Sequence, residues 1–457
     1  MFNPYLHITA VAFGIALYVL VTHAGRRRRT PSAAIAWVVA MIAFPYATIP
    51  LFVFFGSRKF VRPALGVSWR VPIHPSSAGA EWNKALAASL GLAPARDNAR
   101  ITVFEEGPAA LDALIAMIGN ASRRIDLCTF IFADDEAGRR VVDALTDCAV
   151  RGCRVRVLLD ALGGVRMSRD MRRRLAHAGV VVRKFMPLLH AFGQGRGNLR
   201  NHRKLVVVDG WRFWSGGRNI ADEYFLDRSG RAAWLDMSFV VEGDLAADAA
   251  LVFERDWVSA GGFSGEVRST EADRSAATSQ AVAQLIPSGP DQAADAIHAV
   301  LLNAIYHAKT RVLAATPYFV ADASLLEAIV IACRRGVRVS LLLPRRSNHR
   351  LADWARERDL RELAAAGADI RLLPTMLHAK VVVVDDLMAL CGSANLDSRS
   401  LFLNYELATA FYSPPVIDVF ARWHERIEGL AQQYVPRSPS LARDIAEGMV
   451  RSIGFQL

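Results

Sequence analysis

The sequence contains one long unit twice, and this repeat constrains the fold more than any other feature. Blocks recur in one order, and each joins a short β-branched apolar run to a segment of helical periodicity. The first copy opens with RRIDLCTFIFADD and closes with NHRKLVVVDGWRFWSGGRNI; the second opens with TRVLAATPYFVAD and closes with LHAKVVVVDDLMALCGSANL. Strands and helices in alternation predict an α/β fold. Because the period is far longer than that of a solenoid, we expect two pseudo-twofold-related mixed-sheet repeats that form one body.

Each copy closes with the same polar pattern. A histidine, a lysine and an aspartate have the spacing H-x-K-x4-D, and a glycine-containing turn and an asparagine follow. Residues two apart in a strand share a face, so the histidine and the lysine can point at one ligand. The turn can bring the asparagine amide back toward the same point. The residues are His202, Lys204, Asp209, Gly216, Gly217 and Asn219 in the first copy, and His378, Lys380, Asp385, Gly392, Ser393 and Asn395 in the second.

These residue types suit phosphoryl transfer. Lysine and asparagine can bind the non-bridging oxygens of a phosphate, while histidine can attack phosphorus or move a proton. The chemistry requires no metal and no cofactor, and no cluster has the spacing of a metal site. One such pattern could arise by chance in a chain of this length. Two such patterns at corresponding points of a repeat make it very improbable that these residues serve the structure alone.

Carboxylates are needed beside such histidines, to fix the tautomer and stabilise the imidazolium. Asp236 in WLDM and Glu406 in LNYE follow their motifs at comparable distances and are the candidates for orienting the histidines; the alternative is that they are ordinary structural carboxylates. Asp209 and Asp385 complete the two catalytic motifs. A carboxylate beside the phosphate would oppose its charge, so we expect these two to hold the lysine or the adjacent loop.

Two apolar segments precede the repeats. PYLHITAVAFGIALYVLVTHAG and PSAAIAWVVAMIAFPYATIPLFVFFG carry no formal charge and are separated by a run of four arginines. Each is long enough to cross a hydrocarbon core of roughly 30 Å, which predicts a two-helix transmembrane hairpin. A cleaved signal peptide is the alternative for the first, but its basic residues follow the apolar run instead of preceding it. Basic residues also follow the second segment, so the sequence leaves the membrane topology open.

We therefore divide the chain into a transmembrane hairpin (1–60), a linker with at most one short helix (61–100), a first repeat (101–262), a connecting loop (263–284) and a second repeat with a tail (285–457). The 457 residues are 52% hydrophobic and carry a net charge of +11. That charge favours anionic partners, either nucleic acid or acidic lipid. The five cysteines are odd in number and form no CxxC pair, which indicates reduced core residues.

The paired motifs resemble those of the phospholipase D superfamily. Several further segments are similar to those of bacterial cardiolipin synthases, and together they cover the chain from its first residue to about residue 430: SANLDSRSLFLNYE, TPYFV, SGPD, RNHRK, NIADEYF, WLDM and FGSRK. The resemblance implies a phospholipase D-like fold and an enzyme of the bacterial inner membrane, with more than one membrane pass. It also implies that the partners are phosphatidylglycerol and anionic membrane lipid, with no nucleic acid.

In that family one histidine forms a phosphohistidine and the other protonates the departing alcohol, then acts as base when a second alcohol attacks. The resemblance implies His202 as the nucleophile, His378 as the acid and base, and the paired lysines and asparagines as the phosphate-binding groups. The product would be cardiolipin, with glycerol released when phosphatidylglycerol is the donor. Phosphatidylethanolamine is the other candidate donor, and the residues do not distinguish the two.

Two other functions fit the same residues. A phospholipase D-type phosphodiesterase would pass the intermediate to water, with phospholipid or, less readily, nucleic acid as its substrate. A non-catalytic membrane scaffold is disfavoured because every polar member of both motifs is present. Tyr318 and Phe319 could line a lipid or glycerol pocket, or could simply pack in the core.

Overall fold

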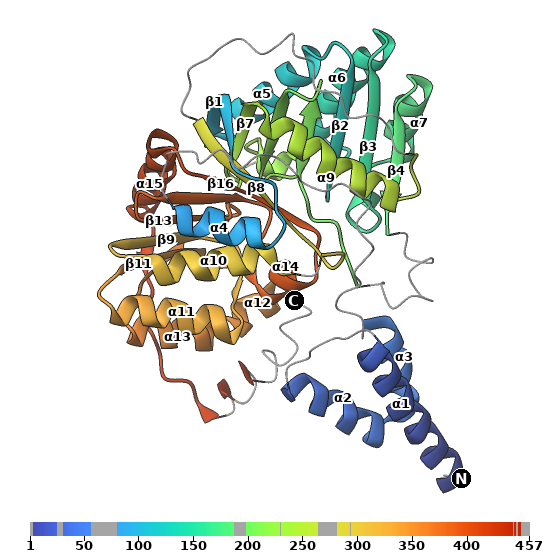
Figure 1. Cartoon of the computed structure of the whole chain (residues 1–457), viewed down its shortest axis with the longest axis vertical. Coiled ribbons are helices and arrows are strands. Elements are labelled where there is room, and N and C mark those ends of the chain that lie inside the picture. Colours follow the sequence, from blue (N-terminus) through green and yellow to red (C-terminus); the bar gives the residue numbers. More distant parts are fainter. Residues whose placement is uncertain are drawn as a thin grey trace.

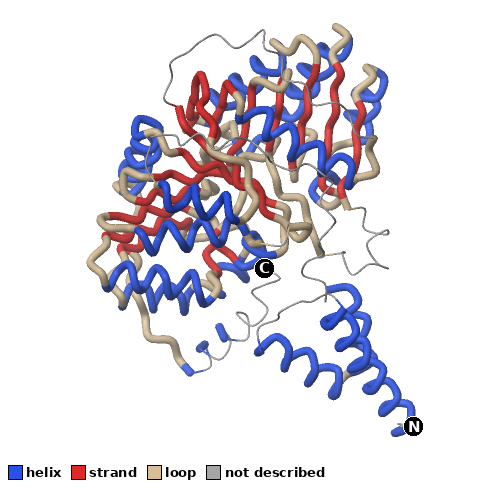
Figure 2. The backbone as a smooth tube through the Cα atoms, viewed as in Figure 1, coloured by secondary structure: helices blue, strands red, loops and turns tan. Residues whose placement is uncertain are grey.

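The computed structural model describes residues 3–24, 31–55, 80–186, 198–228, 230–263, 281–292, 294–441, 443–444 and 447–448. A group of N-terminal helices and a larger α/β body are visible in Figure 1. The strands of the body form one layer with helices on both of its faces (Figure 2).

The N-terminal region forms three helices where the sequence predicted two. They are α1 (Pro4–Ala24), α2 (Pro31–Ala43) and α3 (Pro45–Phe55). The second predicted membrane helix is interrupted at Phe44, because proline at position 45 disfavours helical geometry in the residue before it. The three helices pack around Phe52, whose ring centroid lies 5.5 Å from that of Tyr18 and 5.2 Å from that of Trp37. In the part of the chain that the structure describes, no helix combines the length and the apolar character needed to span a membrane.

Fifteen strands from the described ranges form one sheet, in the order β17-β12-β11-β9-β13-β14-β16-β8-β1-β7-β6-β5-β2-β3-β4. The first-half strands are β1 (Arg96–Phe104), β2 (Arg124–Thr129), β3 (Arg154–Asp160), β4 (Val181–Phe185), β5 (Leu205–Val208), β6 (Arg212–Gly216) and β7 (Ser238–Gly243). The second-half strands are β8 (Ala281–Ser288), β9 (Arg311–Ala315), β11 (Arg338–Pro344), β12 (Asp369–Leu373), β13 (Val381–Val384), β14 (Met388–Gly392), β16 (Glu406–Phe411) and β17 (Gln432–Gln433). A separate pair is formed by β10 (Phe319–Val320) and β15 (Leu396–Asp397).

The two halves of the large sheet share one topology. The order β4-β3-β2-β5-β6-β7-β1 in the first half matches β12-β11-β9-β13-β14-β16-β8 in the second. At the centre β1 and β8 pair antiparallel, with Asp97 opposite Val282, so the sheet continues from one half into the other. In each half, parallel neighbours (β2 and β3, β9 and β11) adjoin antiparallel ones (β5 and β13). This confirms the prediction of two mixed-sheet α/β repeats that form one body.

Helices cover both faces of the sheet. Those of the first half are α5 (Gly107–Gly119), α6 (Glu136–Val150), α7 (Arg169–His177), α9 (Leu245–Ser259) and the 3-10 helices η1 (Gly163–Arg166) and η3 (Asp222–Tyr224). Those of the second half are α10 (Ala296–His307), α11 (Ala323–Arg334), α12 (Arg350–Ala355), α13 (Glu357–Ala365), α14 (Ser398–Phe402) and α15 (Pro414–Glu428). One apolar core, under α9 and α15, runs through both halves. It crosses the seam where the ring centroids of Phe239 and Phe411 lie 5.0 Å apart.

Two boundaries differ from those predicted. The region expected to be a linker (61–100) contains the one short helix predicted for it, α4 (Glu81–Ser89), but the first strand, β1, already begins at Arg96. In α4 the amide of Asn83 donates to the sulfur of Met388 at 2.9 Å, so this helix packs on the second half although it precedes the first. The connecting loop expected at 263–284 ends earlier, because β8 begins at Ala281; residues 264–280 lie outside the described residues.

The apolar runs of the two motifs form central strands that are buried on both faces. In β5, Leu205 and Val207 join the core shared by both halves, while Val206 and Val208 join the core on the other face. The valines of β13 alternate in the same way between the shared core and a second-half core. Each fully buried valine contributes about 1.5–3 kcal/mol, and a shift of register by one residue would reverse every side chain. The position of each histidine and lysine pair, immediately before these strands, is fixed as a result.

The motif aspartates lie at the far ends of these strands, away from the histidine and lysine pairs that the same motifs contain. Asp209 follows β5, and its carboxylate accepts hydrogen bonds from the backbone N–H groups of residues 122–124. Asp385 follows β13 and accepts equivalent bonds from residues 309–311. A strand of four residues is about 13 Å long, which keeps these carboxylates away from the lysines. They hold the loops that lead into β2 and β9. Of the two roles expected from the sequence, holding the lysine or holding the adjacent loop, the contacts agree with the second.

Asp385 tests this structural role. Burial raises the pKa of its carboxyl, but the donated N–H groups outweigh burial and the pKa is lowered overall. Asp385 also has a φ of 49°, which asparagine tolerates, so Asp385→Asn removes the charge without new backbone strain. We expect the free energy of unfolding to fall by about 1–2 kcal/mol in chemical denaturation. The control is Asp386→Asn, whose side chain is 83% exposed and should change stability by less than about 0.5 kcal/mol. Equal effects of the two substitutions would contradict the role.

Candidate active site

The two histidines lie at the seam between the repeats, and each is held by the backbone of the other repeat. The N–H of His202 donates to the carbonyl of Tyr405 at 2.9 Å. The N–H of His378 donates to the carbonyl of Leu235 at 2.7 Å. Short parallel bridges accompany these bonds, between Asn201 and Tyr405 and between Leu235 and Leu377. The structure therefore brings the two motifs together through exchanged main-chain contacts.

The carboxylates are exchanged in the same way. Nδ1 of His202 lies 3.1 Å from Oε1 of Glu406, and Nδ1 of His378 lies 2.6 Å from Oδ2 of Asp236. Both carboxylates are buried. Burial raises their pKa values, but the paired histidine and the nearby lysine together outweigh burial, so both pKa values are lowered and the groups stay ionised. A carboxylate on Nδ1 leaves Nε2 as the ring nitrogen that can face a substrate.

The two lysines place positive charge inside this buried site. Lys204 Nζ donates to the carbonyl of His202 at 2.8 Å, and Lys380 Nζ lies 2.8 Å from Nδ1 of His378. Burial lowers the pKa of Lys204 to about 8 and, together with repulsion from Lys204, that of Lys380 to about 7; the site carboxylates act in the opposite direction. An anion bound between the lysines would offset the cost of burying them.

The pKa values of both histidines are lowered, which favours the neutral imidazoles. Burial lowers the pKa of His202 against the attraction of Glu406. Burial and the nearby charge of Lys380 lower the pKa of His378 to about 3. A neutral imidazole is the form that can attack phosphorus, and a bound phosphodiester anion would raise both pKa values and help the second imidazole to hold a proton.

Aromatic rings border the histidines. Phe130 makes an edge contact with His202 at a centroid distance of 5.1 Å. His378 contacts both Tyr224 and Trp234, at centroid distances of 4.9 Å and 5.5 Å. These rings exclude water from the imidazoles and account for the dominant effect of burial on their pKa values.

The motif asparagines lie beside the site and contact protein groups. The amide of Asn219 accepts from the backbone N–H of Ile131 at 3.2 Å and donates to the hydroxyl of Tyr224 at 2.9 Å, which fixes that ring against His378. The amide of Asn395 is hydrogen-bonded to the buried carboxylate of Asp397. A direct contact of either amide with phosphate stays a prediction.

Sequence reasoning missed an arginine that supports the first motif. Arg203 is buried, its Nη1 lies 2.5 Å from Oδ1 of Asp256, and its Nε donates to the carbonyl of Glu406 at 3.1 Å. Asp256 also accepts from the amide of Asn201, the residue before His202. The signal in the sequence was an arginine between a catalytic histidine and lysine, where the side chain must point away from the substrate.

A second missed feature is a difference between the two turns. Ser393 donates its hydroxyl to Oε2 of Glu406 at 2.5 Å. The corresponding residue of the first motif is Gly217, and a Cβ there would lie 2.1 Å from Oδ1 of Asp236. The shorter aspartate brings its carboxylate close to the turn, so the turn has no side chain at this point.

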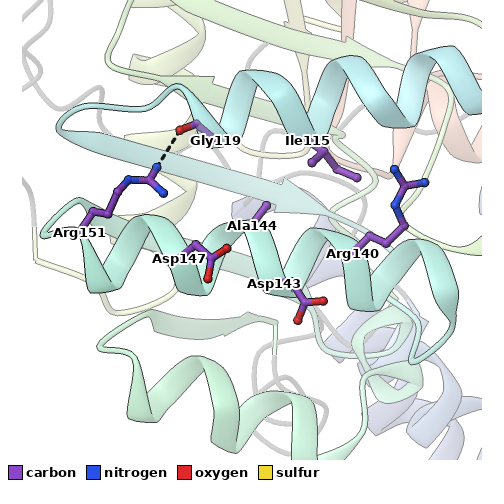
Figure 3. A pocket seen from close by; sticks show the side chains of 7 residues that line it. All are labelled: Ile115, Gly119, Arg140, Asp143, Ala144, Asp147 and Arg151. Atoms are coloured by element: carbon purple, nitrogen blue, oxygen red, sulfur yellow. Dashed lines mark hydrogen bonds between the residues drawn. The ribbon is translucent and has the colours of Figure 1, made fainter.

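A hollow of about 320 Å³ lies elsewhere, over α5 and α6, and Figure 3 shows its mixed acidic and basic lining. Arg151 there donates to the carbonyl of Gly119. None of the catalytic motif residues lines it. Among the described residues, no group of three or more histidine, cysteine, aspartate or glutamate side chains is arranged to hold a metal ion.

Comparison with known proteins agrees with this geometry. The profile of the family described as "Cardiolipin synthase, PLD-like domain" matches residues 114–257 and 301–428. The chain belongs to this family. Cardiolipin synthase A of Pseudomonas syringae is 32% identical over 86% of this chain and 85% of its own length. Cardiolipin synthase of Geobacillus kaustophilus is 31% identical over 84% of this chain and 80% of its own length.

Solved structures share the fold. The phosphatidylserine synthase of Haemophilus influenzae superposes with a TM-score of 0.62 at 16% identity, covering 79% of this chain and 96% of its own. The polyphosphate kinase of Porphyromonas gingivalis superposes with a TM-score of 0.51 at 12% identity, covering 79% of this chain and 54% of its own. The matching family profile, which describes a PLD-like domain, confirms the resemblance to the phospholipase D superfamily.

Gly217 provides a test of the site that leaves every charged residue unchanged. Gly217→Ala should displace Asp236 from His378 and lower phosphatidyl transfer by about 100-fold or more, the usual size of an acid-base contribution. The matched control is Gly119→Ala, where no atom lies within 4 Å of the added Cβ. Transfer is measured with labelled lipid, and circular dichroism verifies the fold. Full activity in Gly217→Ala would show that the close approach to Asp236 is unimportant.

Proposed function

We propose that this protein is a membrane cardiolipin synthase that transfers a phosphatidyl group from one phosphatidylglycerol to another, releasing glycerol. The exchanged contacts of the two histidines carry the proposal, because they form one site with two imidazoles, two lysines and two buried carboxylates. Membership of the cardiolipin synthase family supports the choice of phosphatidyl transfer over hydrolysis.

The reaction has two displacements at phosphorus. In the first, Nε2 of His202 attacks the phosphorus and the bond to the oxygen of the headgroup glycerol breaks. Protonated His378 gives its proton to that oxygen. In the second, His378 removes the proton from the terminal hydroxyl of another phosphatidylglycerol, whose oxygen attacks and breaks the P–N bond. Lys204 and Lys380 bind the non-bridging oxygens, whose charge is stabilised most strongly in a dry site.

Two observations support this division of roles. The side chain of His202 is 15% exposed, against 6% for His378, so His202 is the more accessible to a bulky headgroup. His378 has the shorter carboxylate contact, 2.6 Å against 3.1 Å, which stabilises its imidazolium once the bound phosphodiester offsets the charge of Lys380. Asp236 and Glu406 act by orienting the two rings.

The lipid products test the reaction. Purified protein in detergent is given labelled phosphatidylglycerol, with and without phosphatidylethanolamine, and the products are resolved. We expect cardiolipin and glycerol in equal amounts, with a loss of at least about 1,000-fold in His202→Ala and in His378→Ala. Phosphatidic acid as the only product would establish a hydrolase instead.

The same preparation identifies the nucleophile. His378→Gln should form the phosphohistidine faster than it passes the phosphatidyl group on, so labelled lipid should stay attached to it after an alkaline quench. His202→Gln should retain no label. Label on the His202→Gln protein would reverse the two roles, and activity in both variants would refute the mechanism.

We also propose that helices α1–α3 hold the protein in the bacterial cell membrane. Their apolar side chains point largely outward, as expected for helices in contact with lipid. The exposed ones are Tyr5, Leu6, Ile8, Phe13, Val19, Leu20, Ile35, Val39, Ile42, Phe44, Tyr46, Leu51 and Val53. The two-pass arrangement predicted from the sequence stays a prediction.

Alkaline extraction of membranes tests the anchor. We expect wild-type protein to remain in the pellet, because carbonate does not weaken apolar contacts. Replacing Leu6, Phe13 and Leu20 with serine should release a substantial fraction into the supernatant. The control carries serine at Val150, Leu430 and Val435, which lie on the α/β body and are at least as exposed as the three anchor residues. Release of the control and the anchor variant alike would contradict the proposal.

A further inference from the structure

Exposed apolar side chains occur in corresponding loops of the two repeats. Leu162 and Val165 follow β3 in the first repeat, and Leu351 and Trp354 follow β11 in the second. Strands β3 and β11 hold equivalent positions in the two halves of the sheet. Val165 is 66% exposed and Trp354 is 58% exposed. Duplication of an exposed apolar pair at one topological position indicates a shared role for the two loops.

Both loops leave the sheet at the same strand ends as the catalytic residues, which directly precede β5 and β13. The last residues of β3 lie beside the end of β2, and the end of β2 pairs with the start of β5, directly after Lys204. The end of β11 lies beside the end of β9, which pairs with the start of β13, directly after Lys380. The two apolar pairs therefore lie at the active-site edge of the body.

Hydrogen bonds tie the first loop directly to the catalytic motif. The carboxylate of Asp160, at the end of β3, accepts from the backbone N–H of Leu162 at 2.8 Å through Oδ1. Its Oδ2 accepts from the backbone N–H of Asn201 at 2.9 Å, and Asn201 directly precedes His202. The loop and the histidine are thus fixed by one buried side chain.

The second loop is tied to the segment after β9. The hydroxyl of Tyr318 donates to Asn348, and its ring makes an edge contact with that of His349 at 5.4 Å. Tyr318 packs beside Val320 and against Ala352 and Ala355 of α12. These contacts show that Tyr318 supports the second loop.

The exposed side chains of these loops are complementary to an anionic lipid surface. Arg345, Arg346 and Arg350 are exposed beside Leu351 and Trp354, while the nearby Asp353 is engaged by Arg356 and by the backbone N–H of Ser347. Arg169 is exposed beyond Val165. Arginine keeps its charge at any physiological pH, each basic residue near such a surface contributes about 1 kcal/mol, and tryptophan favours the headgroup layer.

We propose that these two loops, residues 162–166 and 345–354, insert into the headgroup layer of an anionic bilayer and hold the active-site edge against it. The substrate phosphate would then reach the histidines without the lipid leaving the membrane. The inference rests on the proposed function only in that the substrate is a membrane lipid. Insertion itself can be measured without turnover.

Fluorescence quenching tests insertion in the full-length protein. Wild type and Trp354→Phe are reconstituted in vesicles of phosphatidylglycerol and phosphatidylcholine that carry brominated acyl chains. The difference between their emission spectra reports Trp354, and we expect it to be strongly quenched. In vesicles of phosphatidylcholine alone, quenching should be weaker, because the arginines lose their partner. An unquenched difference spectrum in anionic vesicles would overturn the proposal.

A matched pair of valines tests the consequence for activity. Val165→Ser should lower the rate on vesicles by about tenfold, the equivalent of ~1.4 kcal/mol, and lower it much less on dispersed short-chain phosphatidylglycerol. Val150 is 74% exposed at the end of α6, near the opposite edge of the sheet, and Val150→Ser should leave both rates unchanged. Equal losses on the two substrates would refute docking. Quenching without any cardiolipin synthesis would refute the proposed function and leave docking intact.

Discussion

The exchange of carboxylates between the repeats is the interaction on which the rest of the site depends. Each histidine takes its hydrogen-bond partner from the other half of the chain, at 2.6 Å and 3.1 Å. The continuous sheet and the apolar core under α9 and α15 hold the two halves in the register that these distances require. Packing far from the substrate therefore sets the tautomer and orientation of both imidazoles.

The site is also a balance of buried charges. Two lysines and two carboxylates are buried with the histidines, and each lysine experiences both carboxylates. Lysine pKa values of about 8 and about 7, below the ordinary value, show that burial outweighs this attraction. A phosphodiester supplies the negative charge that the lysines lack, so substrate binding and protonation of the site are coupled. The aromatic rings at the histidines strengthen that coupling by excluding water.

The repeat, the mixed α/β fold and the catalytic pairs could be predicted from the sequence, because strand periodicity and motif spacing are local. The two-residue period of a strand was enough to predict that His202 and Lys204 share one face. The exchange of Asp236 and Glu406 between repeats could not be predicted, since it depends on how two copies pack. The break at Phe44 was missed because membrane helices tolerate proline, so the sequence predicted one continuous helix that included Pro45. The displacement of Asp209 and Asp385 from the site follows from strand length alone, and here the spacing already contained the answer.

The exchanged contacts also bear on how such a chain could arise and be divided. One repeat in isolation holds a histidine and a lysine, but the carboxylate that orients its histidine belongs to the other copy. A single-repeat ancestor of this design would have had a complete site only as a symmetric dimer. Within one chain the two copies can differ, as the Gly217 and Ser393 turns do, each matched to a carboxylate of different length. The two halves are no longer interchangeable parts.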